Sequence, residues 1–165
     1  PSKIDNVVMS LLSYFTRNNF EKTIHGYCQE IGWTISKVDA DYARLSFEME
    51  SGREQSLHII RFDSTLEFSV PSQVAFEEGD EIPGWISTLL MRNNSKFKVG
   101  FWCIETINSR SVYSVMHNAE QSLMDRDYFA SIVRRLVGAC DDFETSLEEM
   151  MTDAEKEDED SDDDV

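Results

Sequence analysis

The segment Phe97-Lys-Val-Gly-Phe-Trp-Cys-Ile-Glu-Thr-Ile107 has apolar residues at both odd and even positions. Successive side chains of a strand point to opposite faces, so this pattern predicts a strand with two largely apolar faces. Trp102 and Ile104 would share one face. The other face would carry Phe97, Val99, Phe101 and Cys103. We expect a helical layer of this chain to cover one face, and either another helix or a second copy to cover the other.

Two helical segments flank this strand in the sequence. Before it, residues 82–92 carry an apolar face at helical spacing, formed by Ile82, Ile86, Leu89 and Leu90. Pro83 suits the first turn of a helix, where its missing N–H costs nothing, and Asp80 is placed to cap that helix. After the strand, residues 112–116 predict a second strand. From Asp125 onward apolar residues recur with a period of about 3.6, which predicts a long amphipathic helix.

The sequence before the short helix has the two-residue period of half-buried strands. Residues 43–50 alternate apolar and polar side chains, and residues 57–62 and 66–70 are further strand candidates joined by short turns. An earlier strand contains Trp33. Pro71 is expected to end the fourth strand, because proline cannot donate a hydrogen bond to a neighbouring strand. Four strands in succession predict an antiparallel meander.

The N-terminal region has a helical pattern. Apolar residues recur at helical spacing in residues 4–16 and again in residues 20–31. Asn18-Asn19 interrupts the phase, so the pattern is compatible with one kinked helix and with two separate helices. Gly32 is expected to end the second segment, because glycine readily adopts the left-handed conformation found at many helix ends.

These patterns predict one α+β domain over residues 1–152, in which residues 1–19 form an N-terminal helical extension. The expected architecture is an antiparallel sheet of five to six strands, a meander followed by a hairpin, packed with helices and completed by a long C-terminal helix. Residues 153–165 contain nine acidic residues and one lysine. We expect this tail to be disordered, because it cannot bury enough apolar area to offset its ordering entropy.

The charge of the chain restricts its partners. The formal net charge of the 165 residues is −17, of which −8 lies in residues 153–165 and −9 in the rest. Such a surface repels nucleic acids and anionic membranes and favours basic or apolar protein partners. No stretch approaches the ~20 apolar residues that a membrane-spanning helix needs. We therefore expect a protein partner, and neither nucleic acid nor a membrane. The tail would either bind basic proteins as an adaptor or only aid solubility.

The sequence contains no motif that specifies an enzyme, a metal site or a cofactor. It lacks a glycine-rich phosphate loop, a CxxC pair and an HExxH motif. His25 and Cys28 lie three residues apart in a helical segment, so a small thiol-dependent enzyme is the catalytic alternative, although no orienting group is identifiable. The three cysteines are odd in number and lie in apolar-patterned segments, which is typical of buried thiols in a reducing cytoplasm. We predict a cytoplasmic protein without catalytic activity, metal or cofactor.

Several segments that connect the predicted helices and strands resemble those of known proteins. These are Gly32-Trp33 before the meander, Phe68-Ser-Val-Pro71 at its end, and Trp85-Ile-Ser-Thr-Leu-Leu-Met-Arg-Asn-Asn94 before Phe97-Lys-Val-Gly-Phe101. With the order of elements over residues 20–151, they resemble the YbjN-like family and the wider type III secretion chaperone-like fold. For secretion chaperones the resemblance implies small, acidic, cytoplasmic dimers that bind an unfolded client segment along apolar grooves. For the YbjN-like family it implies a regulator without an agreed activity, and neither group supplies catalytic residues.

The short helix 82–92 and the strand 97–107 form the predicted dimer or client surface. Its apolar residues would be Trp85, Leu89, Phe101, Trp102 and Ile104. The two tryptophans would act as aromatic anchors, a role such residues often take at interfaces. The sequence thus predicts a non-catalytic protein-binding module, either chaperone-like or a regulatory adaptor, and a homodimer is compatible with it.

Overall fold

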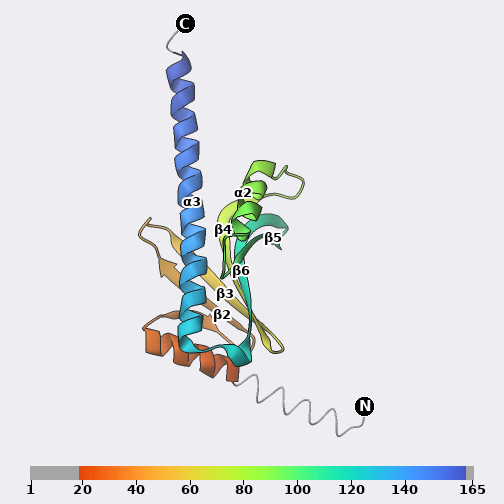
Figure 1. The fold of residues 1–165 in the computed structure, drawn as a ribbon, viewed down its shortest axis with the longest axis vertical. Coiled ribbons are helices and arrows are strands. Elements are labelled where there is room, and N and C mark those ends of the chain that lie inside the picture. The colour runs from red at the N-terminus through yellow and green to blue at the C-terminus, as the bar shows by residue number, and fades with distance from the viewer. Residues whose placement is uncertain (1–18, 163–165) are drawn as a thin grey trace.

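A computed structural model describes the backbone of residues 19–162 and the side chains of residues 19–153. The predicted helix at residues 4–16 lies outside the described residues. Helical residues 19–31 lead into a six-stranded sheet and two further helices (Figure 1). The elements are β1 (Ile35–Val38), β2 (Tyr42–Glu48), β3 (Glu54–Phe62), β4 (Thr65–Phe76), α2 (Gly84–Asn94), β5 (Phe101–Ile107), β6 (Arg110–Glu120), the short 3-10 helix Gln121–Leu123, and α3 (Arg126–Asp162). The predicted α+β class is confirmed.

The sheet has the strand order β1-β2-β3-β4-β6-β5, and every neighbouring pair is antiparallel. The first four strands form the predicted meander and the last two the predicted hairpin. The hairpin joins the meander through β6, because the chain leaves β4, passes through α2 and returns at the far edge. β5 is therefore an edge strand, and β1 forms the opposite edge.

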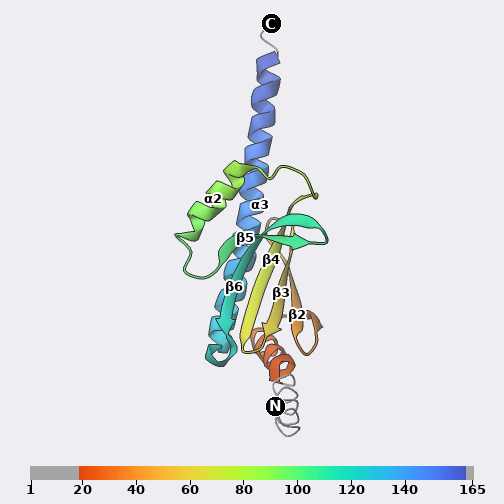
Figure 2. The same cartoon turned by 90° about the vertical axis from the view of Figure 1, so that its right-hand side faces the viewer.

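The helices cover one face of the sheet. Figure 1 shows α3 running along this face, with helical residues 19–31 across its lower end and α2 beside β5 near the upper end. In Figure 2 the sheet lies in front of α3, and none of the described helices covers β3 and β4 from this side. We call this uncovered side the open face.

The core lies between the sheet and α3. Leu45, Ile59 and Phe68 from the sheet are fully buried, as are Phe129 and Leu136 of α3. These residues occupy the positions that the two-residue and 3.6-residue periods assign to the inner faces. Gly32 ends the first helix with a φ of +83°, as predicted.

Helix α3 is fastened to the sheet by a buried carboxylate. Glu144 accepts hydrogen bonds from Gln55 Nε2 and from the backbone N–H of Gln73, each at 2.6 Å. Arg53 Nε lies 3.3 Å from the same carboxylate. A buried charge is tolerated when it is paired and hydrogen-bonded in this way.

The prediction that Pro71 ends the fourth strand is wrong, because β4 continues to Phe76. Pairing between β3 and β4 stops at His58 and Ser69, so Pro71 has no neighbour on that side that needs its N–H. The register with β6 then shifts between Pro71 and Ala75. This irregularity frees the backbone N–H of Gln73, which donates to Glu144 of α3.

The strand predicted from residue 97 begins at Phe101. Gly100 has a φ of +92°, which turns the chain before the strand starts. A Cβ atom at this position would lie 2.7 Å from Cδ2 of Leu136, so the backbone of Gly100 packs directly against α3. Phe97 and Val99 pack against the core from a loop and not from a strand.

Helix α2 begins later and is capped differently than the sequence predicts. Pro83 is its N-cap residue, and no side chain caps the helix there. Asp80 instead accepts a hydrogen bond from the backbone N–H of Glu77 at 3.1 Å, which closes a turn before the helix. The aspartate therefore acts as a turn former, a role common for this residue.

Helix α3 continues through Asp162, whereas the acidic run from residue 153 predicts disorder. A helix that is already formed extends without a new nucleation step, so α3 can continue into the acidic run. The upper part of α3 rises past the end of the sheet in Figure 1. Disorder of the tail stays a prediction, and so does the division of the chain at residue 152.

Candidate protein-binding surface

Trp102 lies in the core and not on the surface. Its side chain is 4% exposed, and its ring centroid is 4.9 Å from that of Phe143 on α3. One apolar face of β5 therefore packs against the chain's own helix. The role of an exposed anchor, which the sequence predicts for Trp102, does not fit this position, because α3 is long enough to place an aromatic residue over it.

Helix α2 presents apolar side chains on two flanks of its buried stripe. Ile86 and Leu90 form the stripe. Trp85 is 56% exposed and lies on one flank with Leu89, one helical turn away and also exposed. Met91, which the sequence analysis did not single out, is exposed on the other flank.

The remaining predicted surface residues lie on β5. Ile104 is 46% exposed, and Phe101 is exposed to a lesser degree. Phe101 and Ile104 are three residues apart on β5, and successive side chains of a strand alternate between faces, so these two point to opposite faces of the sheet. The five predicted residues therefore do not form one patch: Trp85, Leu89 and Ile104 are exposed on the helical side, Phe101 on the open face, and Trp102 is buried.

A small apolar cavity separates α2 from β5. Its volume is about 150 Å³. The lining comes from Ser87, Leu90 and Met91 of α2, Trp102, Cys103 and Ile104 of β5, and Tyr113 of β6. Ser87 and Tyr113 satisfy each other through a hydrogen bond of 2.7 Å between their hydroxyl groups. The cavity is thus suited to an apolar side chain, because its polar groups are already paired.

Asn94, the last residue of α2, occupies the outer edge of β5. Its side chain accepts a hydrogen bond from the Trp102 N–H at 2.6 Å and donates one to the Trp102 carbonyl at 3.1 Å. A neighbouring strand would make the same two bonds. The amide of Asn94 therefore acts as a one-residue substitute for a seventh strand.

The same edge is uncovered further along β5. In an antiparallel pair alternate residues direct their backbone groups away from the partner strand, so Ile104 and Thr106 face outward as Trp102 does. Within the part of the chain that the structure describes, no group makes hydrogen bonds to the backbone of these two residues. An edge of this kind is a template for pairing with another strand.

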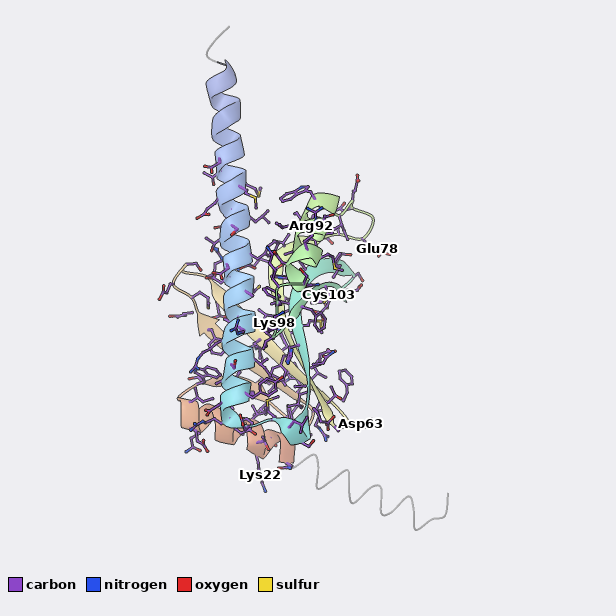
Figure 3. The ribbon with its side chains drawn as sticks, in the orientation of Figure 1. Lys22, Asp63, Glu78, Arg92, Lys98 and Cys103 are labelled. Atoms are coloured by element: carbon purple, nitrogen blue, oxygen red, sulfur yellow. The ribbon has the colours of Figure 1, made fainter. Side chains whose placement is uncertain are left out.

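The catalytic alternative gains no support from the geometry. Cys28 is buried on the inner face of its helix, whereas His25 is exposed. Burial raises the pKa of the Cys28 thiol to about 11, so little of the reactive thiolate exists at neutral pH. Burial likewise raises the pKa of Cys103, labelled in Figure 3, to about 11, with Glu105 and Glu67 contributing.

His117 lies within β6 and is half-buried. The Gly100 N–H donates to its Nδ1 at 3.2 Å, and its Nε2 lies 2.9 Å from the Tyr128 hydroxyl. Burial lowers the pKa of the imidazole. The neutral His117 imidazole thus holds the loop before β5 in place.

Two general properties of the described chain are relevant to function. None of its helices is long and apolar enough to cross a membrane. Among the described residues, no group of three or more histidine, cysteine, aspartate or glutamate side chains is arranged to hold a metal ion.

The arrangement of sheet and helices is a YbjN-like, type III secretion chaperone-like fold. A chain in the structure of the HopA1–SchA chaperone–effector complex matches with a TM-score of 0.53 and 9% sequence identity, over 82% of this chain and 95% of that chain. YbjN from E. coli, a candidate transcription regulator, matches with a TM-score of 0.51 and 14% identity, over 74% of this chain and 86% of that chain. At these identities the likeness concerns the fold alone. No family model and no curated protein sequence matches the chain.

Proposed function

We propose that this chain is a non-catalytic protein-binding module, chaperone-like or regulatory, that binds an extended segment of a partner protein at the edge of β5. The observation that carries the proposal is the contrast along this edge. Asn94 satisfies the outward backbone groups of Trp102, whereas those of Ile104 and Thr106 are uncovered among the described residues. A partner strand that pairs with β5 would satisfy them with the same geometry.

The apolar cavity supplies side-chain recognition beside the backbone contacts. A strand added to β5 would direct alternate side chains toward α2, where the cavity of about 150 Å³ lies next to Ile104 and Met91. One apolar residue of the partner would enter the cavity and bury the exposed surface of both side chains. Main-chain bonds would thus provide affinity, and the cavity would favour an apolar residue at one position.

The structural neighbours support the general class of function. One of them belongs to a chaperone–effector complex, in which one protein holds another. The unpaired state of Cys28, Cys103 and Cys140 agrees with the proposed cytoplasmic location. A second copy of the chain is one partner that this edge would accept, since two β5 strands would pair across a two-fold axis.

The substitution Thr106→Pro tests this proposal. Proline removes an outward N–H and blocks pairing on that side, while the inward ladder to β6 is preserved. Wild-type chain and the variant are used in parallel as bait in native lysate, and retained proteins are quantified by mass spectrometry. We expect at least one protein to be lost with Thr106→Pro and to be retained with Phe62→Ala, which removes an exposed aromatic residue elsewhere.

Light scattering of the same variants tests the homodimer. A wild-type dimer that becomes a monomer with Thr106→Pro would identify a second copy as the occupant of the edge. If the captured proteins and the mass are the same for wild type and Thr106→Pro, the β5 edge is not the binding site and the proposal is wrong.

A further inference from the structure

The open face of the sheet carries apolar side chains that none of the described helices covers. Ile60 and Phe62 of β3 point to this face, because Ile59 is buried on the helical side and successive side chains of a strand alternate. Phe62 is 57% exposed, Ile60 is half-buried, and Phe101 of β5 is exposed on the same face. Apolar surface of this kind is typical of a site against which another segment packs.

A hollow continues this apolar surface toward the β5–β6 hairpin. Its volume is about 510 Å³. The apolar residues of its lining are Tyr42, Ile60, Pro71, Ala75, Ile107 and Val112. Two pairs of its polar groups already satisfy each other. The Tyr42 hydroxyl lies 2.9 Å from His58 Nδ1, and the Ser69 hydroxyl donates to Glu105 Oε2 at 2.7 Å. The hollow therefore offers mainly apolar surface to an occupant.

The described chain begins near the foot of this face, which is the end of β3 that carries Phe62. Tyr27, within helical residues 19–31, donates its hydroxyl to the Met124 carbonyl at 2.8 Å. The 3-10 helix that precedes Met124 is joined to Ser64, in the turn after β3, by a backbone hydrogen bond of 2.7 Å. Figure 2 shows the same helical residues at the lower end of β3 and β4. The preceding part of the chain therefore starts beside the open face.

The sequence of this preceding part has an apolar stripe of its own. Residues 1–18 lie outside the described side chains and backbone, and their apolar residues recur at helical spacing. These are Ile4, Val7, Val8, Leu11, Leu12 and Phe15. A short helix with such a stripe gains most of its stability from packing that stripe against other apolar surface. Asn18-Asn19 interrupts the period, and asparagine is common where a chain turns, so the segment can fold back toward the sheet.

The length and charge of this segment fit the open face. As a helix, residues 4–16 would span about 20 Å, and the nine residues of β3 span about 30 Å, so a helix that starts at the foot reaches the hollow. Lys3 and Arg17 against Asp5 give residues 1–18 a formal charge of +1, whereas the rest of the chain carries −18. Glu105, which lines the hollow, has no ion-pair partner among the described residues.

We propose that residues 4–16 fold back as a helix and pack their apolar stripe against the open face of their own chain. Phe15 then lies near Phe62 at the foot of the face, and Ile4 lies toward the hollow. This helix covers β3 and β4 on the side opposite α3, which gives the sheet a helical layer on each face. The β5 edge stays accessible, so the covered face directs a partner strand to that edge. The proposal does not depend on the edge being a binding site.

NMR of the full chain tests this arrangement. We expect nuclear Overhauser contacts between methyl groups of residues 4–16 and the Phe62 ring. Leu11→Asp places a charge at the centre of the stripe, so it should remove these contacts and speed hydrogen exchange of the amides of residues 7–15 about tenfold. Ser13→Asp adds the same charge on the opposite side of the predicted helix and should preserve both the contacts and the slow exchange. Phe62→Ala should speed exchange of the same amides.

The other occupants of the open face give different results. In a mixture of isotope-labelled and unlabelled chains, contacts that occur only between the two kinds of chain would assign the face to a second copy and overturn the proposal. Equal exchange rates in wild type and Leu11→Asp would mean that residues 4–16 pack against nothing in the isolated chain. That result would leave the face to a partner protein and would also overturn the proposal, as would contacts to α2 in place of Phe62.

Discussion

The two tryptophans of the predicted surface should respond to truncation in opposite ways. Trp102 is 4% exposed and contacts Phe143 with a centroid distance of 4.9 Å, whereas Trp85 is 56% exposed on α2. Replacing Trp102 with alanine removes a large buried ring and leaves a cavity between β5 and α3. Such changes cost about 3–5 kcal/mol of unfolding free energy. Trp85→Ala removes a ring that is already largely in water and should change stability by no more than about 0.5 kcal/mol.

Thermal unfolding followed by circular dichroism measures the difference. In a domain of this size 1 kcal/mol corresponds to roughly 2–4 °C, so Trp102→Ala should lower Tm by about 10 °C and Trp85→Ala by about 1–2 °C. Equal losses of stability in the two variants would refute the assignment of Trp102 to the core.

Three further predictions concern separate parts of the chain. Gly100→Ala should lower the free energy of unfolding by more than about 2 kcal/mol, because a steric clash with Leu136 adds to the cost of a positive φ. Gly52→Ala, with φ +84° and open space around it, should lower it by only about 1 kcal/mol. Urea unfolding compares the two variants. His117 has a lowered pKa in the folded state, so the unfolded state binds more protons below pH 6.5; stability should fall between pH 7 and pH 5, and less steeply in His117→Gln, as urea midpoints at each pH would show. The like charges of residues 153–165 oppose helix formation and are screened by salt, so added salt should increase the helix content of the full chain relative to a chain without these residues. Circular dichroism of both chains measures this, and a difference between them that does not change with salt would contradict this account of the tail.

The order of the elements could be predicted from the sequence because each element has its own period. Residues 43–49 alternate strictly, and the segment after Asp125 has a helical stripe that one helix buries. The residues that end or turn the elements were harder to predict from the sequence. Pro71 lies where β4 has lost its β3 neighbour, and Gly100 turns the chain before β5, and both facts depend on what lies beside the residue in space.

The binding surface could be located only in part. The exposure of Trp85, Leu89 and Ile104 follows from helix and strand spacing, but the burial of Trp102 depends on how far α3 extends. The role of Asn94 could not be predicted, because its two hydrogen bonds to Trp102 arise from the packing of α2 against an edge strand. Asparagine at the end of a helix is otherwise an ordinary feature of sequences.

The account depends on an edge of β5 that is closed at one residue and open at the next two outward positions. Residue-resolved amide hydrogen exchange tests this directly, first on the isolated chain and then with a captured partner. We expect the Trp102 amide to be protected in both states, and the amides of Ile104 and Thr106 to exchange quickly alone and slowly in the complex. Protection of all three in an isolated monomer, or fast exchange of Ile104 and Thr106 in the complex, would contradict the proposed mode of binding.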